Sequence, residues 1–236
     1  MVLLKGLQKT TLVDYPGKVA CTVFTAGCNF KCPFCQNPDL IEKSRYTSLE
    51  TVEEQDFLEF LGKRKKWIEG VVISGGEPCF HKDLPDFMKK IKDKVFLVKL
   101  DTNGSYPKIL EDIIKKKIVD FIAMDIKAPL EKYKNSAGVS VRKDNIKKSI
   151  KLVKEAGKSG IDYEFRITLV PGLHKKDDII QIGKLLKGSK KIVLQQFENT
   201  NTYDPSFRKI DPYTEDEFIM FKGLLEQYVE EIELRI

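Results

Sequence analysis

The sequence predicts an α/β fold built on a parallel sheet, and two observations support this. Short apolar runs rich in β-branched residues alternate six times with segments of helical periodicity along the 236 residues. Strands that alternate with helices form right-handed crossovers, which place the strands parallel in one sheet. The strand candidates are almost continuously apolar, as expected when a sheet is covered on both faces. Such a sheet is either open or curled into a barrel.

Each strand candidate is an apolar run that stops at glycine, proline or a polar residue. The six runs are 19–26, 71–74, 95–100, 121–126, 163–170 and 192–197. The helix candidates have apolar residues three or four positions apart. Pro107 suits a first helical turn, Gly157 suits a C-terminal cap, and Thr214 with Glu217 forms a capping box. The six helices are expected at 51–67, 83–92, 107–116, 144–156, 177–186 and 214–229.

The composition fits one soluble unit. Hydrophobic residues make up 42% of the chain and charged residues 32%, which suits a single sizeable core. No apolar run approaches the ~18–20 residues of a membrane span, and the first residues lack the features of a secretory signal. We therefore expect one domain over residues 1–236 in the cytoplasm, with no membrane contact. Lysine and arginine (41) outnumber aspartate and glutamate (35), but no aromatic residues interleave with the lysine runs, so no nucleic-acid partner is expected.

Three of the five cysteines fall within eight residues, at Cys28, Cys32 and Cys35. Disulfides are not expected in a cytoplasmic chain, so the spacing C-x3-C-x2-C indicates metal ligation. A structural zinc site uses four ligands, and an ordinary electron-transfer iron–sulfur cluster uses four cysteines. A cluster on three cysteines leaves one iron open for a substrate or cofactor. Cys21 lies in an apolar run and is expected in the core, and Cys79 is expected to be an inert thiol.

Other polar and glycine residues gather where the predicted strands end. In parallel α/β sheets, ligands bind at the carboxyl ends of the strands. The cysteines follow the first strand, and the remaining candidates follow or end the next three strands. These candidates are Gly75, Gly76, Glu77, Pro78, Asp101, Thr102, Asn103, Gly104, Asp125 and Lys127. We therefore expect one site at this rim.

These motifs together resemble the radical S-adenosylmethionine (SAM) superfamily, and within it the activating enzymes of glycyl-radical proteins. The resemblance covers nearly the whole chain and implies a partial (β/α)6 TIM-type barrel of parallel strands, the radical SAM core. The matching segments are the cluster loop 28–38 with its aromatic Phe34, 75–78 (GGEP), 101–104 (DTNG), 125–127 (DIK), and Arg166 with Pro171-Gly172.

The resemblance implies a 4Fe–4S cluster on the three cysteines, with SAM bound to the open iron through its amino and carboxylate groups. One electron from the cluster would cleave the sulfonium, and the 5′-deoxyadenosyl radical would take a hydrogen atom from a glycine of a partner enzyme. Asp101 and the backbone of residues 75–77 would receive the SAM ammonium, Lys127 the carboxylate and Asp125 a ribose hydroxyl. Lys127 and Arg166 are the catalytic candidates beside the cysteines. The full set implied for SAM is Phe34, Gly75, Gly76, Glu77, Pro78, Asp101, Asn103, Asp125, Lys127 and Arg166.

Several of these residues have a purely structural alternative. The paired glycines 75–76 can form a tight turn after a strand. Asp125 and Lys127 share one face of a strand and can form a structural ion pair. The stem of Arg166 can pack in the core with its head paired to a carboxylate.

The partner follows from a finer resemblance. Residues 12–18 (LVDYPGK), 194–197 (LQQF) and 201–205 (NTYDP) resemble the branch that activates anaerobic ribonucleoside-triphosphate reductase. The expected partners are that glycyl-radical enzyme and an acidic flavodoxin or ferredoxin as electron donor. A pyruvate formate-lyase-type activase, a radical SAM enzyme with another substrate, and a structural metal-binding module are the alternatives. Gln36 replaces a histidine common in activating enzymes, and it hydrogen-bonds without titrating. His81 and His174 are expected at the surface or behind the site.

Overall fold

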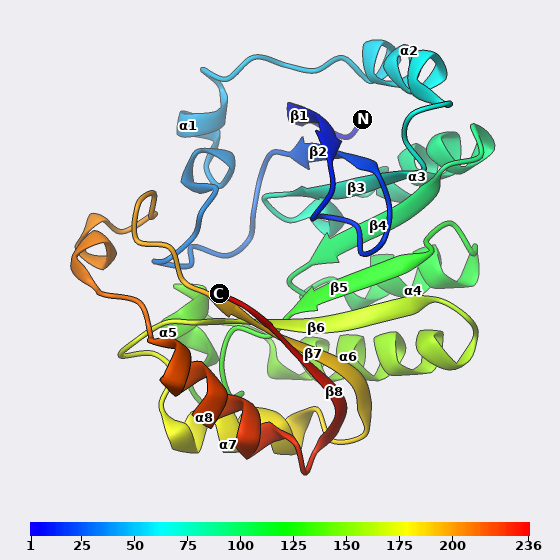
Figure 1. The fold of residues 1–236 in the computed structure, drawn as a ribbon. Helices are drawn as coiled ribbons and strands as arrows, with labels where there is room; N and C mark the ends of the chain where they lie inside the picture. Colours follow the sequence, from blue (N-terminus) through cyan, green and yellow to red (C-terminus); the bar gives the residue numbers. More distant parts are fainter.

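The computed structural model describes residues 1–236 and contains one eight-stranded sheet with its strands in chain order. β2 to β8 are parallel, and β1 pairs antiparallel with β2. The sheet curls into a partial barrel, and no pairing of β8 with β1 closes it (Figure 1). The strands are Leu4–Thr11 (β1), Ala20–Thr25 (β2), Gly70–Gly75 (β3), Leu97–Thr102 (β4), Phe121–Asp125 (β5), Asp162–Leu169 (β6), Ser189–Gln196 (β7) and Val229–Arg235 (β8).

Helices join successive parallel strands and lie along the outer side of the curved sheet (Figure 1). No helix is both long enough and apolar enough to cross a bilayer. The α-helices are Lys43–Tyr46 (α1), Glu54–Arg64 (α2), Leu84–Asp93 (α3), Pro107–Lys115 (α4), Tyr133–Ala137 (α5), Lys143–Lys158 (α6), Lys176–Leu185 (α7) and Glu215–Leu225 (α8). Three short 3-10 helices are Pro38–Leu40 (η1), Pro78–Phe80 (η2) and Pro205–Lys209 (η3).

The α/β class and the six predicted parallel strands are confirmed, but the two outermost strands were not predicted. β1 reads LKGLQKTT and lacks the continuous apolar run of a central strand. It is also antiparallel to β2, so it is an addition to the six predicted parallel strands. The last helix was predicted over 214–229, but α8 ends at Leu225 and Val229 begins β8. The sequence VEEIELR alternates apolar and charged residues, which is a strand period rather than a helix period.

The two faces of the strands carry different side chains, and this difference creates the site. Along β6, Phe165 and Ile167 belong to the large core cluster, whereas Arg166 lines the cavity at the barrel mouth. Successive side chains of a strand point to opposite faces, so the outward residues pack on helices and the inward ones fill the barrel. A small second cluster that includes Tyr15 and Phe121 fills part of the interior; their rings meet edge to face at 5.9 Å.

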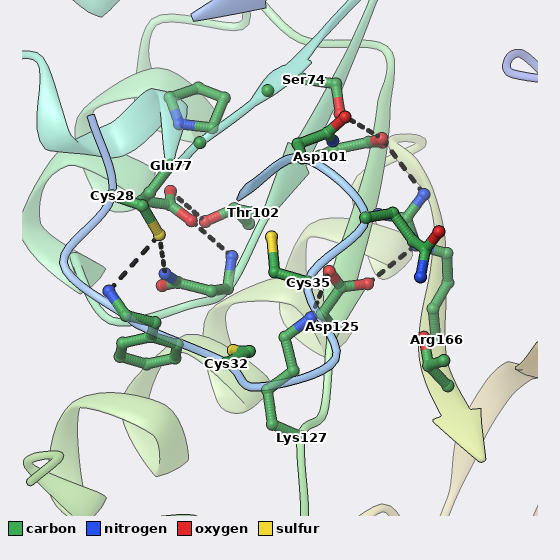
Figure 2. A pocket seen from close by; sticks show the side chains of 18 of the residues that line it. Cys28, Cys32, Cys35, Ser74, Glu77, Asp101, Thr102, Asp125, Lys127 and Arg166 are labelled. Carbon is green, nitrogen blue, oxygen red and sulfur yellow. Dashed lines mark hydrogen bonds and ion pairs between the residues drawn. The ribbon is translucent and has the colours of Figure 1, made fainter. Parts of the chain in front are cut away.

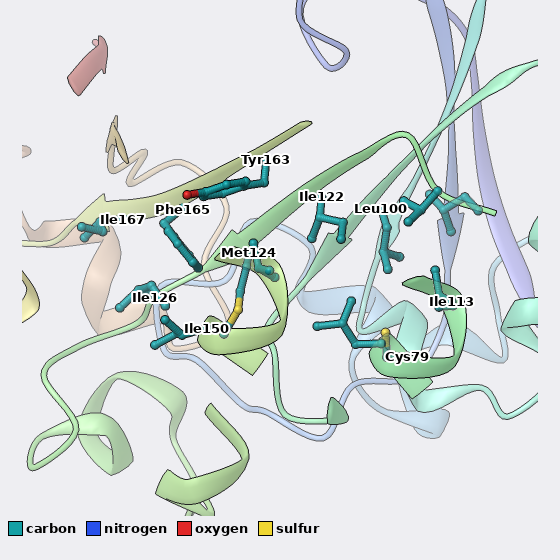
Figure 3. Close-up of a cluster of buried hydrophobic side chains, with 14 of the residues drawn as sticks. Cys79, Leu100, Ile113, Ile122, Met124, Ile126, Ile150, Tyr163, Phe165 and Ile167 are labelled. Carbon is teal, nitrogen blue, oxygen red and sulfur yellow. The ribbon is translucent and has the colours of Figure 1, made fainter. Parts of the chain in front are cut away.

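The main core lies between the sheet and the helices. Figure 3 shows Ile122 and Met124 of β5 on the same side as Ile113 of α4 and Ile150 of α6. All four side chains are at least nine-tenths buried. Because the outward face is packed in this way, the backbone is fixed at the strand ends, and the loops that follow can hold functional side chains on a rigid support.

Candidate active site

One cavity of about 320 Å³ opens at the carboxyl ends of the strands, as the sequence predicts. Its wall contains the three cysteines of the loop and residues in or just after the C-terminal halves of β3, β4, β5 and β6 (Figure 2). All thirteen predicted site residues lie on this cavity. They are Cys28, Cys32, Phe34, Cys35, Gly75, Gly76, Glu77, Pro78, Asp101, Asn103, Asp125, Lys127 and Arg166.

The cysteine loop leaves β2 and is closed at its base by backbone hydrogen bonds. Gly27 N donates to Leu40 O at 2.7 Å, and Cys28 N donates to Ile41 O at 3.2 Å. Within the loop, Cys35 N donates to Cys32 O at 3.0 Å, which makes a tight turn between the second and third cysteines. The loop is therefore an ordered structure that directs its thiols into the cavity (Figure 2).

The three thiols form a donor set that suits an iron–sulfur cluster. All five cysteines are free, and only Cys28, Cys32 and Cys35 line the cavity. Burial raises the pKa of all three thiols, that of Cys32 to about 12, against the lowering effect of Lys127 on Cys32. The thiols are therefore protonated in the free chain, and metal binding must release protons. Cys21 and Cys79 are 0% and 1% exposed in the main core, which confirms the predicted place of Cys21.

Gly75 and Gly76 are required by close approach of the backbone. Gly75 has φ +116°, and a Cβ there would lie 2.4 Å from the backbone of Thr25. A Cβ on Gly76 would lie 2.3 Å from the carbonyl oxygen of Gly27, at the base of the cysteine loop. The turn after β3 is therefore tight, as the structural alternative held, and it also brings the 75–78 segment against the loop.

Glu77 is a buried anchor for the loop after β4. Its side chain is almost fully buried, and it accepts hydrogen bonds from Thr102 Oγ1 at 2.7 Å, Asn103 N at 2.6 Å and Cys79 N at 3.0 Å. Burial raises the pKa of the Glu77 carboxyl to about 7, although these hydrogen bonds act in the opposite direction. The carboxylate is thus engaged within the protein and holds Asn103 at the cavity wall.

Five charged side chains form a continuous network on the inner face of the barrel. Figure 2 shows four of them, Asp101, Asp125, Lys127 and Arg166. Arg166 joins two neighbouring strands: its Nη1 lies 3.1 Å from Asp101 Oδ2, and its Nε lies 2.9 Å from Asp125 Oδ1. Lys99 Nζ lies 2.6 Å from Asp101 Oδ1, and Lys127 Nζ lies 3.0 Å from Asp125 Oδ2. The ion pairs considered as structural alternatives for Asp125, Lys127 and Arg166 are therefore present, and they lie in the cavity wall.

The network keeps its members ionised. Burial by itself would raise the pKa of Asp101 and Asp125, but the charges of Arg166 and the lysines lower both, that of Asp125 to about 2. Burial likewise opposes the charge on Lys127, but Asp125 raises the pKa of this lysine above its usual range. Lys127 and Arg166 place two positive charges in the cavity wall, where they can meet an anionic group of a ligand.

Two parts of this arrangement were not predicted from the sequence. Lys99 is 1% exposed and forms the inner end of the network; its spacing of two from Asp101 on one strand was the available signal. His174 was expected at the surface or behind the site, and the surface location is wrong, because it is 0% exposed. Its Nδ1 accepts from Val170 N at 3.0 Å, and its Nε2 lies 2.9 Å from Lys127 O. His81 is partly buried, and its Nε2 lies 2.8 Å from Ala26 O.

Comparison with known proteins identifies the family. The sequence profile of the Radical SAM superfamily matches residues 22–186. A protein of Methanocaldococcus jannaschii, provisionally named as a glycyl-radical enzyme activating enzyme, is 33% identical over 99% of this chain and 95% of its own length. A pyruvate formate-lyase-activating enzyme of Streptococcus mutans is 31% identical over 83% of this chain and 75% of its own length.

Solved structures show the same fold at lower identity. QueE from Escherichia coli matches 99% of this chain and 93% of its own chain, with a TM-score of 0.59 and 15% identity. SuiB from Streptococcus suis, bound to SAM, matches 88% of this chain with a TM-score of 0.60 and 16% identity, and this chain spans about half of its length (47%). The chain belongs to the radical SAM superfamily, whose enzymes use a 4Fe–4S cluster and SAM.

Proposed function

We propose that this chain is a glycyl-radical enzyme activating enzyme that uses residues 1–236 as one radical SAM domain. The observation that supports the proposal most strongly is the single cavity shared by the three cysteine thiols and the Asp101–Arg166–Asp125–Lys127 network. Relatives that align over most of this chain carry the names of such activating enzymes. A cytoplasmic location is part of the proposal, because five free thiols persist in a reducing compartment.

Each group on the cavity wall has a task in this proposal. Cys28, Cys32 and Cys35 would hold the cluster, and the charged network would bind and orient SAM. Lys127 would meet the SAM carboxylate, and Asp101 would meet its ammonium. When bound, the reduced cluster and SAM would supply a 5′-deoxyadenosyl radical that can take one hydrogen atom from a glycine of the partner. The protein contributes orientation and exclusion of other hydrogen donors.

The finer proposal is that the partner is anaerobic ribonucleoside-triphosphate reductase. It is supported by the resemblance of residues 12–18, 194–197 and 201–205 to that branch. A pyruvate formate-lyase is the second candidate, because relatives at 31% and 28% identity are named as activating enzymes of that lyase. A flavodoxin or ferredoxin would supply the electron, and an acidic protein of this kind suits a chain of net charge +6.

The decisive experiment starts with anaerobic reconstitution of the full chain with iron and sulfide. After addition of dithionite and SAM, we expect 5′-deoxyadenosine, and we expect its loss in the variant Cys35→Ala. Cys21→Ala is the matched control, because Cys21 is equally a free cysteine but lies in the core. A fully reconstituted chain that releases no 5′-deoxyadenosine would refute the proposed activity.

The partner is tested separately by electron paramagnetic resonance. The reconstituted chain is mixed with SAM, reductant and either the reductase or the lyase from the same genome. We expect a glycyl-radical signal on the reductase. A signal on the lyase alone would assign the chain to the second candidate.

A further inference from the structure

The short helix α5 and Gly138 contact the cysteine loop, although they lie more than a hundred residues further along the chain. Lys31 N, one residue before Cys32, donates a hydrogen bond to Ala137 O at 2.8 Å. The rings of Phe30 and Tyr133 meet edge to face with centroids 6.3 Å apart. Tyr133 and Ala137 are both at least 99% buried, so α5 contacts the cysteine loop in the protein interior and not at the surface.

Gly138 makes the closest approach. It follows α5 with φ +69°, and a Cβ at this position would lie 2.0 Å from the carbonyl oxygen of Lys31 and 2.7 Å from its carbonyl carbon. Both atoms belong to the backbone, so no side-chain rotation can relieve the overlap. Any residue other than glycine must push the Lys31–Cys32 peptide away.

Tyr133, the first residue of α5, holds the backbone of Lys127, two residues after β5 ends. The hydroxyl of Tyr133 accepts a hydrogen bond from Lys127 N at 3.3 Å, and it lies 3.5 Å from Asp125 O. Lys127 in turn extends its ammonium over the ring of Phe34 in the cysteine loop, 5.8 Å from the ring centroid. One short helix therefore contacts the cysteine loop along its length, and through Tyr133 it also contacts the backbone of the network lysine.

We infer that Tyr133 and Gly138 are positioning residues. Through them, α5 contacts both the cysteine loop and the Lys127 backbone, and this fixes the position of Cys32 relative to Lys127. In this arrangement the backbone of the cysteine loop packs directly against Gly138, and the Tyr133 hydroxyl holds the backbone N–H of Lys127. The inference rests on the proposed role of the three cysteines in holding the cluster. It adds that cluster binding depends on a glycine that carries no donor atom and lies outside the loop.

The test compares Gly138→Asn with Gly160→Asn. Asparagine tolerates positive φ better than other residues with a Cβ, so both variants are expected to fold. Gly160 also has positive φ (+89°) but has no atom within 4 Å of an added Cβ, which makes it a matched control. We expect Gly138→Asn to lose most of its iron and sulfide after anaerobic reconstitution and Gly160→Asn to keep them. Without iron, amide hydrogens of residues 30–35 should exchange faster in Gly138→Asn only.

Full iron content and unchanged exchange in Gly138→Asn would overturn the inference. The exchange measurement uses the chain without iron, so it tests the contact between α5 and the cysteine loop independently of cluster binding. A wild type that takes up no cluster would overturn the proposed function and not this inference.

A second pair of variants tests the contact between Tyr133 and Lys127. Tyr133→Phe should keep its iron but bind SAM several-fold more weakly, whereas Ser136→Ala should match the wild type, because the buried Ser136 hydroxyl has no hydrogen-bond partner. Unchanged SAM affinity in Tyr133→Phe would remove the Lys127 half of the inference.

Discussion

Replacing Arg166 with methionine is the sharpest test of the charged network, because this one side chain joins two carboxylates. The pKa of Asp125 is about 2 in the folded chain against 3.8 for an ordinary aspartate. At about 1.4 kcal/mol per pH unit, this difference corresponds to about 2 kcal/mol of folding stability at neutral pH. Arg166 is the largest of the charges that lower this pKa, and it also bonds Asp101. Arg166→Met is therefore expected to lower the free energy of unfolding by about 2–3 kcal/mol.

The pH dependence gives this prediction a definite sign. A carboxyl whose pKa is lowered by folding stabilises the protein above its unfolded pKa, and this contribution disappears as the pH falls through the folded value. The difference between wild type and Arg166→Met should thus be constant above about pH 5 and shrink from about pH 4 downward. Urea unfolding of the iron-free chain at several pH values measures it.

An exposed ion pair serves as the control for the charge change. Lys89 and Asp93 are both more than half exposed (63% and 62%), so Lys89→Met should change the free energy of unfolding by no more than about 0.5 kcal/mol. A loss in Arg166→Met that is as small as in this control would show that the network contributes little to stability. A large loss that persists undiminished at about pH 3 would show that the side chain acts through packing and not through its charge.

Three further substitutions test other parts of the site. Gln36→Ala removes the 2.6 Å hydrogen bond from Gln36 Nε2 to Glu198 O, which connects the cysteine loop to the segment after β7. We expect this variant to lose its iron faster in air, as measured by the absorbance of the cluster. Its circular dichroism spectrum should match that of the wild type. Glu77→Gln turns an amide NH2 toward a backbone N–H such as that of Asn103 and should cost about 1–3 kcal/mol in urea unfolding. Because burial raises the pKa of Glu77 to about 7, the advantage of the wild type over this variant should narrow as the pH rises from about 5 to 7. Cys79→Ala should keep the full iron content, since Cys79 lies outside the cavity wall; loss of one iron would make it a ligand.

The location of the site could be predicted because it follows from strand direction. The Gly75–Pro78 segment and the residues at 101–104 and 125–127 each lie at the carboxyl end of a parallel strand, and those ends meet at one rim. What the sequence could not show is which of these side chains are partners. Arg166 meets Asp101 across 65 positions of sequence. That contact spans β4, β5 and β6, so it depends on two strand registers and on the curvature of the sheet, and none of these is encoded in a local pattern.

The edge strands were missed for a related reason. A central strand is buried on both faces and reads as an apolar run, but β1 and β8 each have a neighbour on one side only, so their sequences are mixed. β8 contributes a charged side chain instead of an apolar one to the contact with β6. Its Arg235 pairs with the fully buried Glu164 of β6 through two contacts, at 2.9 and 3.1 Å. In β8 the charged residues Glu231, Glu233 and Arg235 alternate with Ile232 and Leu234, and all three form ion pairs.

Chemistry and positioning leave different traces in a sequence. A cluster needs thiols, and a ligand ammonium needs a carboxylate, so the residue types of Cys32 and Asp101 were enough to make them candidates for these roles. Gly138 acts only by leaving room for the Lys31 carbonyl, and an isolated glycine after a short helix has the same sequence context as an ordinary C-terminal cap. Tyr133 likewise acts on a backbone N–H that any residue at 127 would supply. Residues that position others through backbone contacts therefore cannot be found from sequence motifs. They are identified only from the contacts that they make in the folded structure.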